Sequence, residues 1–464
     1  MRIQLTQAVT LDESGQRLRP IEMRIVDGVI DSLSERPLPR EEGWQVYELG
    51  GGLVLPGLVD AHTHLYQSLG TGLYDGLGVN AWLEALIHGY TLSEDEAYDA
   101  TLLGCVEAIR SGTTCVSEMT ELAFADAAAQ AILDSGLRAS LAVMVGDQAE
   151  GNNPPDMNTH QALAATRSFF ERWNGAGWGR LKVLMGPVGL AACTLDLVRG
   201  MRALAEELHT QIVTHCAEGP TETEAVRARY GASEVEMLER CGLLGPDCAL
   251  VHAVWLSERD LQIIANHTGR VVHCPSTNLK IADGIAPAAA LLKKGIPVAL
   301  GCDGAASSGT YDLLKEARLA SLLAKGSGMD AAALPAEQVL HMLTDYGAEA
   351  SGWSGKVGRL AVGYRADLTV LRYPQAHLLG ERGLLSRLIH NTAAGDVAAV
   401  FVDGSPLLWD GHMVSVDEEA LVQRAAGRLR RRDFGPGAYP QKGQPPQAAP
   451  QEWAYFSRRT SKND

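Results

Sequence analysis

Eight apolar, strand-like runs alternate with helical stretches through the middle of this 464-residue chain. Eight strand–helix units over about 270 residues match the count and size of a (β/α)8 barrel, an α/β fold. A doubly wound open sheet is the other candidate, but a glycine-rich fingerprint is expected after its first strand. The sequence there is Ala61-His62-Thr63-His64, which favours the TIM-like barrel. The expected strands are 53–61, 112–118, 138–145, 181–186, 211–215, 249–254, 270–273 and 297–301.

Short strands rich in β-branched residues occur at both ends of the chain, separated by glycine-containing turns. They are expected at 2–9, 21–26, 29–33, 46–49, 368–372, 397–402 and 413–416. Two half-sets of strands predict one small β-sandwich domain formed by both termini. The expected division is 1–55 for the N-terminal half of the sandwich, 56–357 for the barrel, 358–415 for the C-terminal half, and 416–464 for a helix and a Pro/Gly-rich tail.

The charge balance limits the possible partners. Forty basic and 56 acidic side chains give a net charge of −16. Such a surface repels phosphate backbones, so nucleic acid and anionic membrane are excluded as main partners, and a small-molecule substrate is expected. No run is apolar for long enough to cross a bilayer. The eight cysteines form no C-x-x-C pair, which predicts free thiols in a reducing, cytoplasmic compartment.

The strongest chemical signal is the H-x-H pair of His62 and His64, directly after the first apolar run. Residues two apart in a strand point to the same side, so both imidazoles are expected to face one space. That space lies at the carboxyl end of the strand, where barrel enzymes hold their active sites. Paired imidazoles suit Zn²⁺ or Fe²⁺. Taken alone, an H-x-H pair is more often an ordinary pair at the end of a strand.

Further polar residues follow the ends of four later runs. They are His215, His252, His273 and Asp303. A closed barrel gathers such strand ends around one axis, so these side chains are expected to converge. A single histidine on an apolar strand is more often a core residue. Here that explanation would have to apply repeatedly, always at the same end of the strand.

The donor set predicts the kind of ion site. Histidines 62, 64 and 215 with Asp303 leave a position for water, which is typical of a catalytic ion and not of a structural one. Such an ion lowers the pKa of bound water towards about 7. Glu218 follows His215 by three residues, and a carboxylate beside that water can carry protons. The alternative for Glu218 is an acid at the start of the next helix.

Taken together, these motifs resemble the amidohydrolase superfamily. Within it, the chain is most similar to the aminohydrolase branch of cytosine, guanine and S-adenosylhomocysteine deaminases and triazine hydrolases. The similarity runs from residue 2 to residue 430. The segments that carry it are Val54-Leu-Pro-Gly-Leu-Val-Asp-Ala-His-Thr-His64, His215-Cys-Ala-Glu218, His252, His273-Cys-Pro-Ser-Thr-Asn278, Gly284-Ile-Ala-Pro287 and Gly301-Cys-Asp-Gly-Ala-Ala-Ser307.

The resemblance implies one divalent metal ion per subunit, Zn²⁺ first and Fe²⁺ second. Its implied ligands are His62, His64, His215 and Asp303. Glu218 would protonate a ring nitrogen and then the leaving ammonia. His252 would polarise the water or the intermediate, and Asp303 would also accept a proton. Binuclear relatives use a carboxylated lysine after the fourth strand, whereas Lys182 lies too early for this, so one ion is expected.

Substrate contacts are expected from the loop after His64. Gln67 and Trp82 are candidates for reading a flat polar ring by hydrogen bonding and stacking, although Trp82 also suits the start of a helix. This region departs from the resemblance, because Thr71 stands where several deaminases carry an arginine. The stretch 87–90 also lacks the acid that nucleoside-type members place near ribose hydroxyls. Both differences argue against an adenosine-like substrate.

Three further residues are candidate substrate contacts. Glu118 ends the second expected strand and would meet a cationic or amino-bearing ring, unless it pairs with Arg110 or Arg138. His273 and Asn278 are expected to line the pocket or to support its walls.

The predicted function is a metal-dependent hydrolytic deaminase that releases ammonia from an amino-substituted N-heterocycle of nucleobase, nucleoside, pterin or triazine type. The alternative is a hydrolase with the same site that acts on a cyclic amide, an imine or a halogenated triazine. A non-catalytic barrel is disfavoured, because every ligand and the acid–base residue are present. We also expect a homodimer, with the aromatic residues of the tail, 434–464, packed on a surface.

Overall fold

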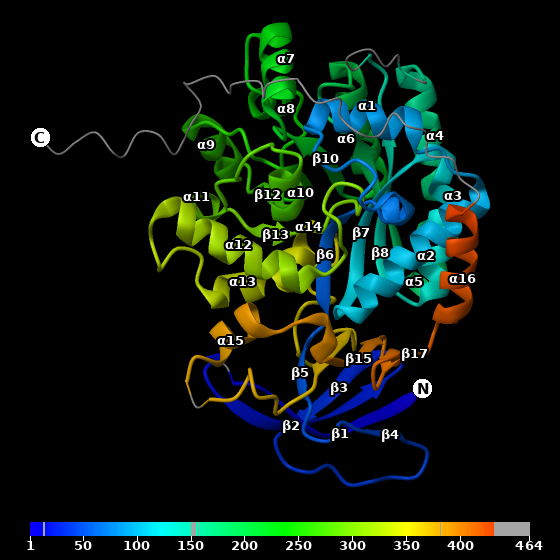
Figure 1. Ribbon diagram of the computed structural model, residues 1–464, viewed down its shortest axis with the longest axis vertical. Helices are drawn as coiled ribbons and strands as arrows, with labels where there is room; N and C mark the ends of the chain where they lie inside the picture. The colour runs from blue at the N-terminus through cyan, green and yellow to red at the C-terminus, as the bar shows by residue number, and fades with distance from the viewer. Residues whose placement is uncertain (13, 150–154, 156, 381, 431–464) are drawn as a thin grey trace, which may run out of the picture.

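Two sheets hold the strands of the described chain, and the polypeptide changes from one sheet to the other at Gly57. The computed structural model describes residues 1–430 except 13, 150–154, 156 and 381, so the predicted tail lies outside the described residues. Figure 1 shows the smaller terminal sheet at one end of the molecule and the helix-covered barrel above it.

The predicted (β/α)8 barrel is confirmed. Eight parallel strands follow one another in chain order around the second sheet. An isolated parallel bridge between Thr63 and Asp303 joins its first and last strands. The strands are β6 (Leu58–Thr63), β7 (Thr113–Glu121), β8 (Arg138–Val145), β9 (Leu181–Pro187), β10 (Ile212–Cys216), β11 (Cys248–His252), β12 (Arg270–His273) and β13 (Val298–Leu300).

Helices cover the outside of the barrel, as Figure 1 shows. Several begin at a side chain that caps exposed backbone N–H groups, for example Ser93 before α2 and Ser257 before α9. The helices that precede strand β13 in the chain are α1 (Val79–Gly89), α2 (Glu94–Arg110), α3 (Ala125–Ser135), α4 (Thr159–Trp173), α5 (Ala176–Gly179), α6 (Leu195–Leu208), α7 (Pro220–Tyr230), α8 (Glu234–Arg240), α9 (Glu258–Asn266), α10 (Pro275–Lys280) and α11 (Ala288–Lys293). Those after it are α12 (Leu313–Gly328), α13 (Ala336–Leu343), α14 (Asp345–Ala350), α15 (Leu384–Asn391) and α16 (Glu418–Leu429).

The first expected barrel strand is divided in two, which corrects the prediction of one strand over 53–61. Residues Leu53–Pro56 form β5 in the terminal sheet, and only β6 belongs to the barrel. Pro56 has no N–H for a continuous ladder. Gly57 donates its N–H to the carbonyl of Asp367 at 2.8 Å, and a Cβ there would lie 2.1 Å from Thr114 Oγ1. The chain therefore turns where only glycine fits.

The predicted β domain from both termini is also confirmed. Its nine strands form one sheet, in which eight follow a single path and the ninth pairs alongside the first strand of the chain. An isolated antiparallel bridge also joins Val29 to Arg365. Inward side chains from both ends of the chain share one core, among them Ile25, Val370 and Phe401. The strands are β1 (Arg2–Leu11), β2 (Leu18–Val26), β3 (Val29–Ser34), β4 (Gln45–Glu48), β5, β14 (Leu368–Leu371), β15 (Val397–Val402), β16 (Ser405–Trp409) and β17 (His412–Met413).

This domain packs on the amino ends of the barrel strands and leaves their carboxyl ends uncovered. Arg138, the first residue of β8, is buried and donates to Asp367 at 2.7 and 3.0 Å. Thr369 donates its hydroxyl to the carbonyl of Gly112, just before β7. The guanidinium of Arg138 also lies 4.8 Å from the ring centroid of Trp353.

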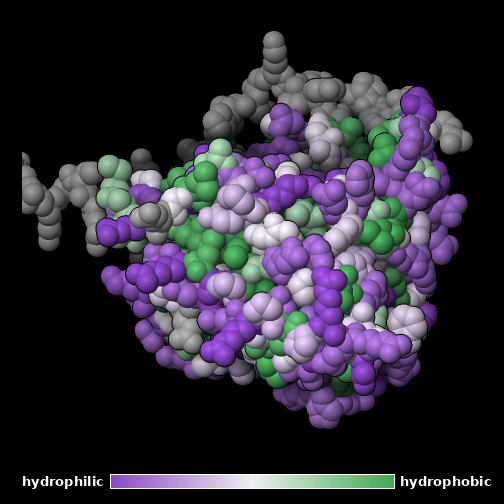
Figure 2. All heavy atoms as spheres, turned by 90° about the horizontal axis from the view of Figure 1, so that it is seen from below, coloured by the Kyte–Doolittle hydropathy of each residue, from purple (hydrophilic) through white to green (hydrophobic). Residues whose placement is uncertain are grey.

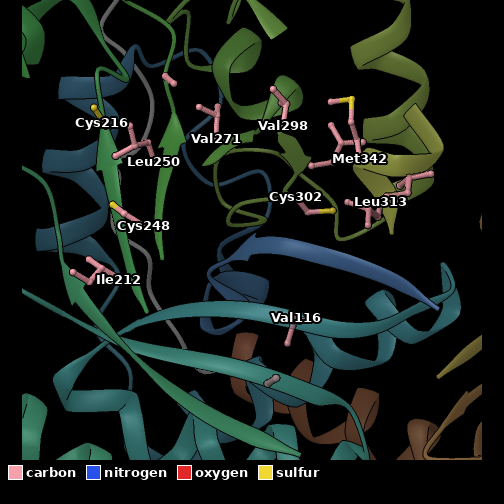
Figure 3. Packing of buried hydrophobic residues seen from close by; sticks show 14 of the residues in the cluster. Val116, Ile212, Cys216, Cys248, Leu250, Val271, Val298, Cys302, Leu313 and Met342 are labelled. Carbon is pink, nitrogen blue, oxygen red and sulfur yellow. The ribbon is translucent and has the colours of Figure 1, made fainter. Parts of the chain in front are cut away.

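Apolar packing fills the space between strands and helices, where Figure 3 shows side chains such as Val116, Leu250 and Met342. The eight cysteines are buried and free, as predicted. Hydrophilic side chains dominate the face in Figure 2, with smaller hydrophobic groups between them. Within the described chain, no helix has the length and apolar character needed to span a membrane.

Candidate active site

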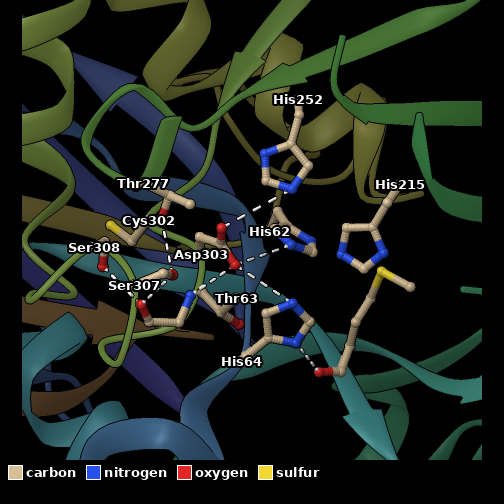
Figure 4. A network of polar contacts seen from close by, with 12 residues as sticks. His62, Thr63, His64, His215, His252, Thr277, Cys302, Asp303, Ser307 and Ser308 are labelled. Atoms are coloured by element: carbon tan, nitrogen blue, oxygen red, sulfur yellow. Dashed lines mark hydrogen bonds and ion pairs between the residues drawn. The ribbon is translucent and has the colours of Figure 1, made fainter. Parts of the chain in front are cut away.

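Three histidines converge at the carboxyl ends of β6 and β10. The ring centroids of His62 and His64 lie 4.7 Å apart, and that of His215 lies 5.0 and 5.5 Å from them. One ligand atom from each lies within 4.8 Å of the others. Figure 4 shows the rings turned toward a common space. The predicted alignment of the H-x-H pair with His215, which lies 151 positions after His64, is therefore present in the fold.

Asp303 and His252 complete this cluster from the strand ends next to β6 and β10. Asp303 Oδ1 lies 3.4 Å from Nε2 of both His62 and His64, and Asp303 Oδ2 lies 4.0 Å from His252 Nε2. Both Asp303 and His252 have positive φ, at 61° and 71°. Such backbone strain in non-glycine residues is concentrated at functional sites. The backbone N–H of Asp303 donates to the carbonyl of His62 at 2.8 Å, which fixes its position across the barrel seam.

Backbone carbonyls orient two of the imidazoles. His64 Nδ1 lies 2.6 Å from the carbonyl of Met119, and His215 Nδ1 lies 2.6 Å from that of Val188. An N–H donated there leaves Nε2 as the free lone pair, which is the usual support for a metal-binding histidine. His62 is fully buried, yet neither of its ring nitrogens makes a hydrogen bond within the described chain. A metal ion would explain that unpaired donor set.

Burial keeps these imidazoles neutral. It lowers the pKa of His62 to about 4 and also lowers the pKa values of His64 and His215. For Asp303, burial opposes ionisation, but the surrounding imidazoles of His62, His252 and His64 outweigh it and hold the pKa well below its usual range. Neutral imidazoles and one carboxylate are the protonation states that a divalent cation requires.

Glu218 lies beside the cluster, two residues beyond β10 and just before α7. Its Oε1 lies 3.4 Å from His252 Nε2. The other nitrogen of that ring, Nδ1, lies 3.0 Å from Asn278 Oδ1. The structure thus brings Glu218, His252 and Asp303 together at the mouth of the barrel, with Asn278 behind them as a support.

Two of the expected substrate contacts lie near the segment after Asp303. The amide of Gln67 is buried against Gly304, and its Oε1 has no hydrogen-bond partner within the described chain. Trp82 begins the apolar part of α1 and donates Nε1 to the carbonyl of Ala306 at 3.4 Å. Trp82 is buried among apolar neighbours, and Gln67 presents an unused polar atom.

Glu118 lies behind the histidines and not in front of them. Its two oxygens accept the N–H of Leu65 at 3.0 and 2.8 Å, and one accepts the hydroxyl of Thr63 at 2.7 Å. It pairs with neither expected arginine, since Arg110 binds Glu418 and Arg138 binds Asp367. In this position Glu118 holds the turn that follows His64.

His273 faces the helix layer. Its neighbours Val272 and Cys274 point into the barrel interior, so His273 points outward, against a cavity of about 150 Å³ between α11 and α12. Burial lowers its pKa to about 3. The structure therefore separates His273 from Asn278, which reaches the site through His252.

Two carboxyl groups at the site were not predicted. Asp60 Oδ1 accepts the N–H groups of Cys302 and His62, at 3.0 and 3.4 Å, and so ties β6 to the loop that carries Asp303. Asp283 is buried in the loop after α10, near Glu218. The signal available for Asp283 was a single acid within the otherwise apolar run 281–288.

Comparison with known proteins agrees with this geometry. Residues 53–407 match the model of the Amidohydrolase family. A 5-methylthioadenosine/S-adenosylhomocysteine deaminase of Syntrophobacter fumaroxidans is 34% identical over 420 residues, 90% of this chain and 94% of that protein. A 5'-deoxyadenosine deaminase of Methanosarcina mazei is 33% identical over 422 residues, with the same shares covered.

Solved structures share the fold. A zinc-bound adenosine deaminase from Xanthomonas campestris has a TM-score of 0.83 and 27% identity, over 92% of this chain and 98% of that one. The zinc complex of an atrazine chlorohydrolase from Arthrobacter aurescens has a TM-score of 0.84 at 21% identity, over 92% and 100%, and supports the fold alone. The predicted hydrolytic aminohydrolase is confirmed, and the chain belongs to the amidohydrolase family.

Proposed function

We propose that this protein is a zinc-dependent deaminase of an amino-substituted purine, with one ion per subunit. The observation that carries the proposal is the convergence of His62, His64, His215 and Asp303 beside Glu218 and His252. Relatives named for adenosine-type substrates at 33% identity or more support the choice of ring. They outweigh the two sequence differences near residues 71 and 87–90.

The described residues fit a divalent ion. The unpaired nitrogens of His62, the oriented Nε2 atoms of His64 and His215, and the carboxylate of Asp303 would hold it. When bound, the ion supplies Lewis-acid chemistry that lowers the pKa of a water molecule towards about 7.

The protein's own acids and bases would carry the protons. Glu218 would donate a proton to the ring nitrogen next to the amino-bearing carbon, which makes that carbon more electrophilic. Asp303 would accept the proton released from water. His252, whose Nδ1–H is oriented by Asn278 Oδ1, would accept a hydrogen bond from the water at Nε2 and so hold the water against the ring carbon. Glu218 would then recover a proton from the new hydroxyl group on the ring carbon and pass it to the amino group, which leaves as ammonia. The proton held by Asp303 would return Glu218 to its starting state.

Two substitutions test this proposal. Glu218→Gln should keep its zinc and lose about 10²–10⁴-fold in kcat, since a general acid–base group contributes that much. His62→Ala should lose zinc. Glu224→Gln, which removes an exposed acid of α7, is the matched control. The assays are metal analysis and release of ammonia, with halide and ring opening measured in parallel. Near-normal turnover by zinc-loaded Glu218→Gln would contradict the proposal.

We also propose that the enzyme acts as a homodimer in the cytoplasm. Eight buried free thiols suit a reducing compartment. The aromatic residues Trp453, Tyr455 and Phe456 supply apolar groups for contact with a second subunit. Light scattering on the full chain and on a chain that ends at residue 430 tests the assembly, and cell fractionation tests the compartment.

A further inference from the structure

Asp283 is a buried carboxyl group without a partner. Its side chain is 1% exposed, and neither Oδ1 nor Oδ2 makes a hydrogen bond within the described chain. Burying a carboxyl group in this way costs free energy that a structural acid would recover through a bonded partner. A group that the fold leaves unsatisfied at an active site points to a ligand.

The backbone around Asp283 is held firmly. Its N–H donates to the carbonyl of Asn278 at 2.8 Å, and its carbonyl accepts Nε1 of Trp255 at 2.7 Å. Asn278 is also the residue that orients His252. The position of the Asp283 side chain is therefore coupled to the same loop that positions the catalytic imidazole.

The carboxyl group faces the segment that carries Glu218. A Cβ built on Gly219, the next residue, would lie 3.3 Å from Asp283 Oδ1 and 3.0 Å from Val79 Cγ1. Asp283 thus lies beside Glu218 where the start of α1 meets the β10–α7 loop. A substrate bound against Glu218 would therefore present one edge to Asp283.

The negative groups around Asp283 favour a ligand group that donates a hydrogen bond over a ligand group that accepts one. Burial raises the pKa of Asp283 to about 10, and the negative charges of Glu218 and Asp303 add to the rise. A ligand N–H group at this position would favour the ionised form of Asp283 and offset its repulsion from the other two carboxyl groups. A ligand acceptor would instead require Asp283 to stay protonated.

We propose that Asp283 determines specificity by accepting a hydrogen bond from a second amino group, on the ring carbon that flanks the nitrogen protonated by Glu218. The substrate class is then a diamino N-heterocycle in which two amino-bearing carbons enclose one ring nitrogen, as in a 2,6-diaminopurine. This inference rests on the proposed function, because it takes the role of Glu218 from it.

A matched pair of ligands tests the inference by binding alone. Purine riboside and 2-aminopurine riboside differ only by the second amino group, and neither carries the amino group that the reaction removes. Calorimetry would measure both dissociation constants for the zinc-loaded protein and its Asp283→Ser, Asp283→Asn and Glu224→Ser variants. Asp283→Asn keeps the shape of the side chain if the serine variant does not fold.

The wild-type protein should bind the 2-amino ligand about tenfold more tightly, as expected for one hydrogen bond to a buried carboxyl group. Asp283→Ser should reduce this ratio to within about twofold, Asp283→Asn should leave a partial preference, and Glu224→Ser should keep all of it. An unchanged ratio in folded Asp283→Ser, no preference in the wild type, or no binding of either ligand would overturn the inference.

Turnover separates this result from the proposed function. Ammonia release would be measured with adenosine and 2-aminoadenosine. If the binding ratio depends on Asp283 but neither compound releases ammonia, the assignment of Asp283 as a recognition group holds and the proposed purine deamination fails. If both compounds release ammonia but the binding ratio does not depend on Asp283, the proposed purine deamination holds and the assignment of Asp283 as a recognition group fails.

Discussion

The position of Glu118 leads to a prediction that separates two interpretations of one residue. The sequence suggests contact with an amino-bearing ring, whereas in the structure its oxygens bind Thr63 and Leu65 on either side of His64. We therefore predict that Glu118→Ala weakens metal binding and leaves the KM of the substrate nearly unchanged.

The size of the effect follows from the donor that is left behind. Alanine would leave the N–H of Leu65 buried without an acceptor, which costs about 1–3 kcal/mol. The hydroxyl of Thr63 keeps a longer contact with the carbonyl of Ser117, at 3.4 Å. At about 1.4 kcal/mol for each factor of ten, this cost equals about 5- to 140-fold weaker metal binding. That range agrees with the 10- to 100-fold typical of residues that support metal ligands.

The assay is competition for zinc with a chromogenic chelator, followed by KM and kcat at saturating zinc. Glu118→Gln keeps an acceptor for Leu65 and should lose less affinity than Glu118→Ala. Glu224→Ala, an exposed acid of α7, should behave as the wild type. Unchanged zinc affinity together with a raised KM in Glu118→Ala would refute the structural interpretation and restore the substrate contact.

Two further predictions concern stability. Arg138→Leu leaves the buried carboxylate of Asp367 without its arginine, whereas Asp403 keeps its ion pair with Arg365. The free energy of unfolding in urea should therefore fall by about 3–5 kcal/mol, and Asp367→Asn in the same chain should recover part of it; no loss would refute the pairing. Burial raises the pKa of Glu316 to about 8, against the hydrogen bonds from Ser276, so the folded state holds a proton that the unfolded state has lost. Stability should therefore fall between about pH 4.5 and 8, by at most about 1.4 kcal/mol per pH unit from this group. Glu316→Gln should flatten that part of the profile in unfolding measurements at a series of pH values, and an unchanged slope would assign it to other groups.

The ligand cluster could be predicted because a parallel barrel turns a linear pattern into a ring. His62, His215 and Asp303 each follow an apolar run, and parallel strands bring the ends of such runs to one rim. The division of the first strand at Gly57 could not be predicted from periodicity, since the residues on both sides are equally apolar. Pro56 was the local sign of the break.

Which side of its strand a given side chain occupies could be learned only from the structure. The pairing of β6 with β7 shifts register between Asp60 and Thr63, so counting in twos does not tell which side of the wall Glu118 occupies. The sequence likewise does not tell which side of β12 His273 occupies, and the structure places it on the outer side, facing the helices. Asp283 lies in a loop whose path is set by Trp255, a contact that no local pattern reveals.

The bridge between Thr63 and Asp303 has a consequence for how the enzyme matures. Residues at the ends of the first and last barrel strands both belong to the proposed metal site, so that site is incomplete until the last strand has docked. An ion that binds all four groups would hold the first and last strands together and so stabilise the closed barrel relative to an opened one. Zinc uptake by a newly made chain, followed as loss of zinc from a chromogenic chelator, would then report that the circle of strands has closed.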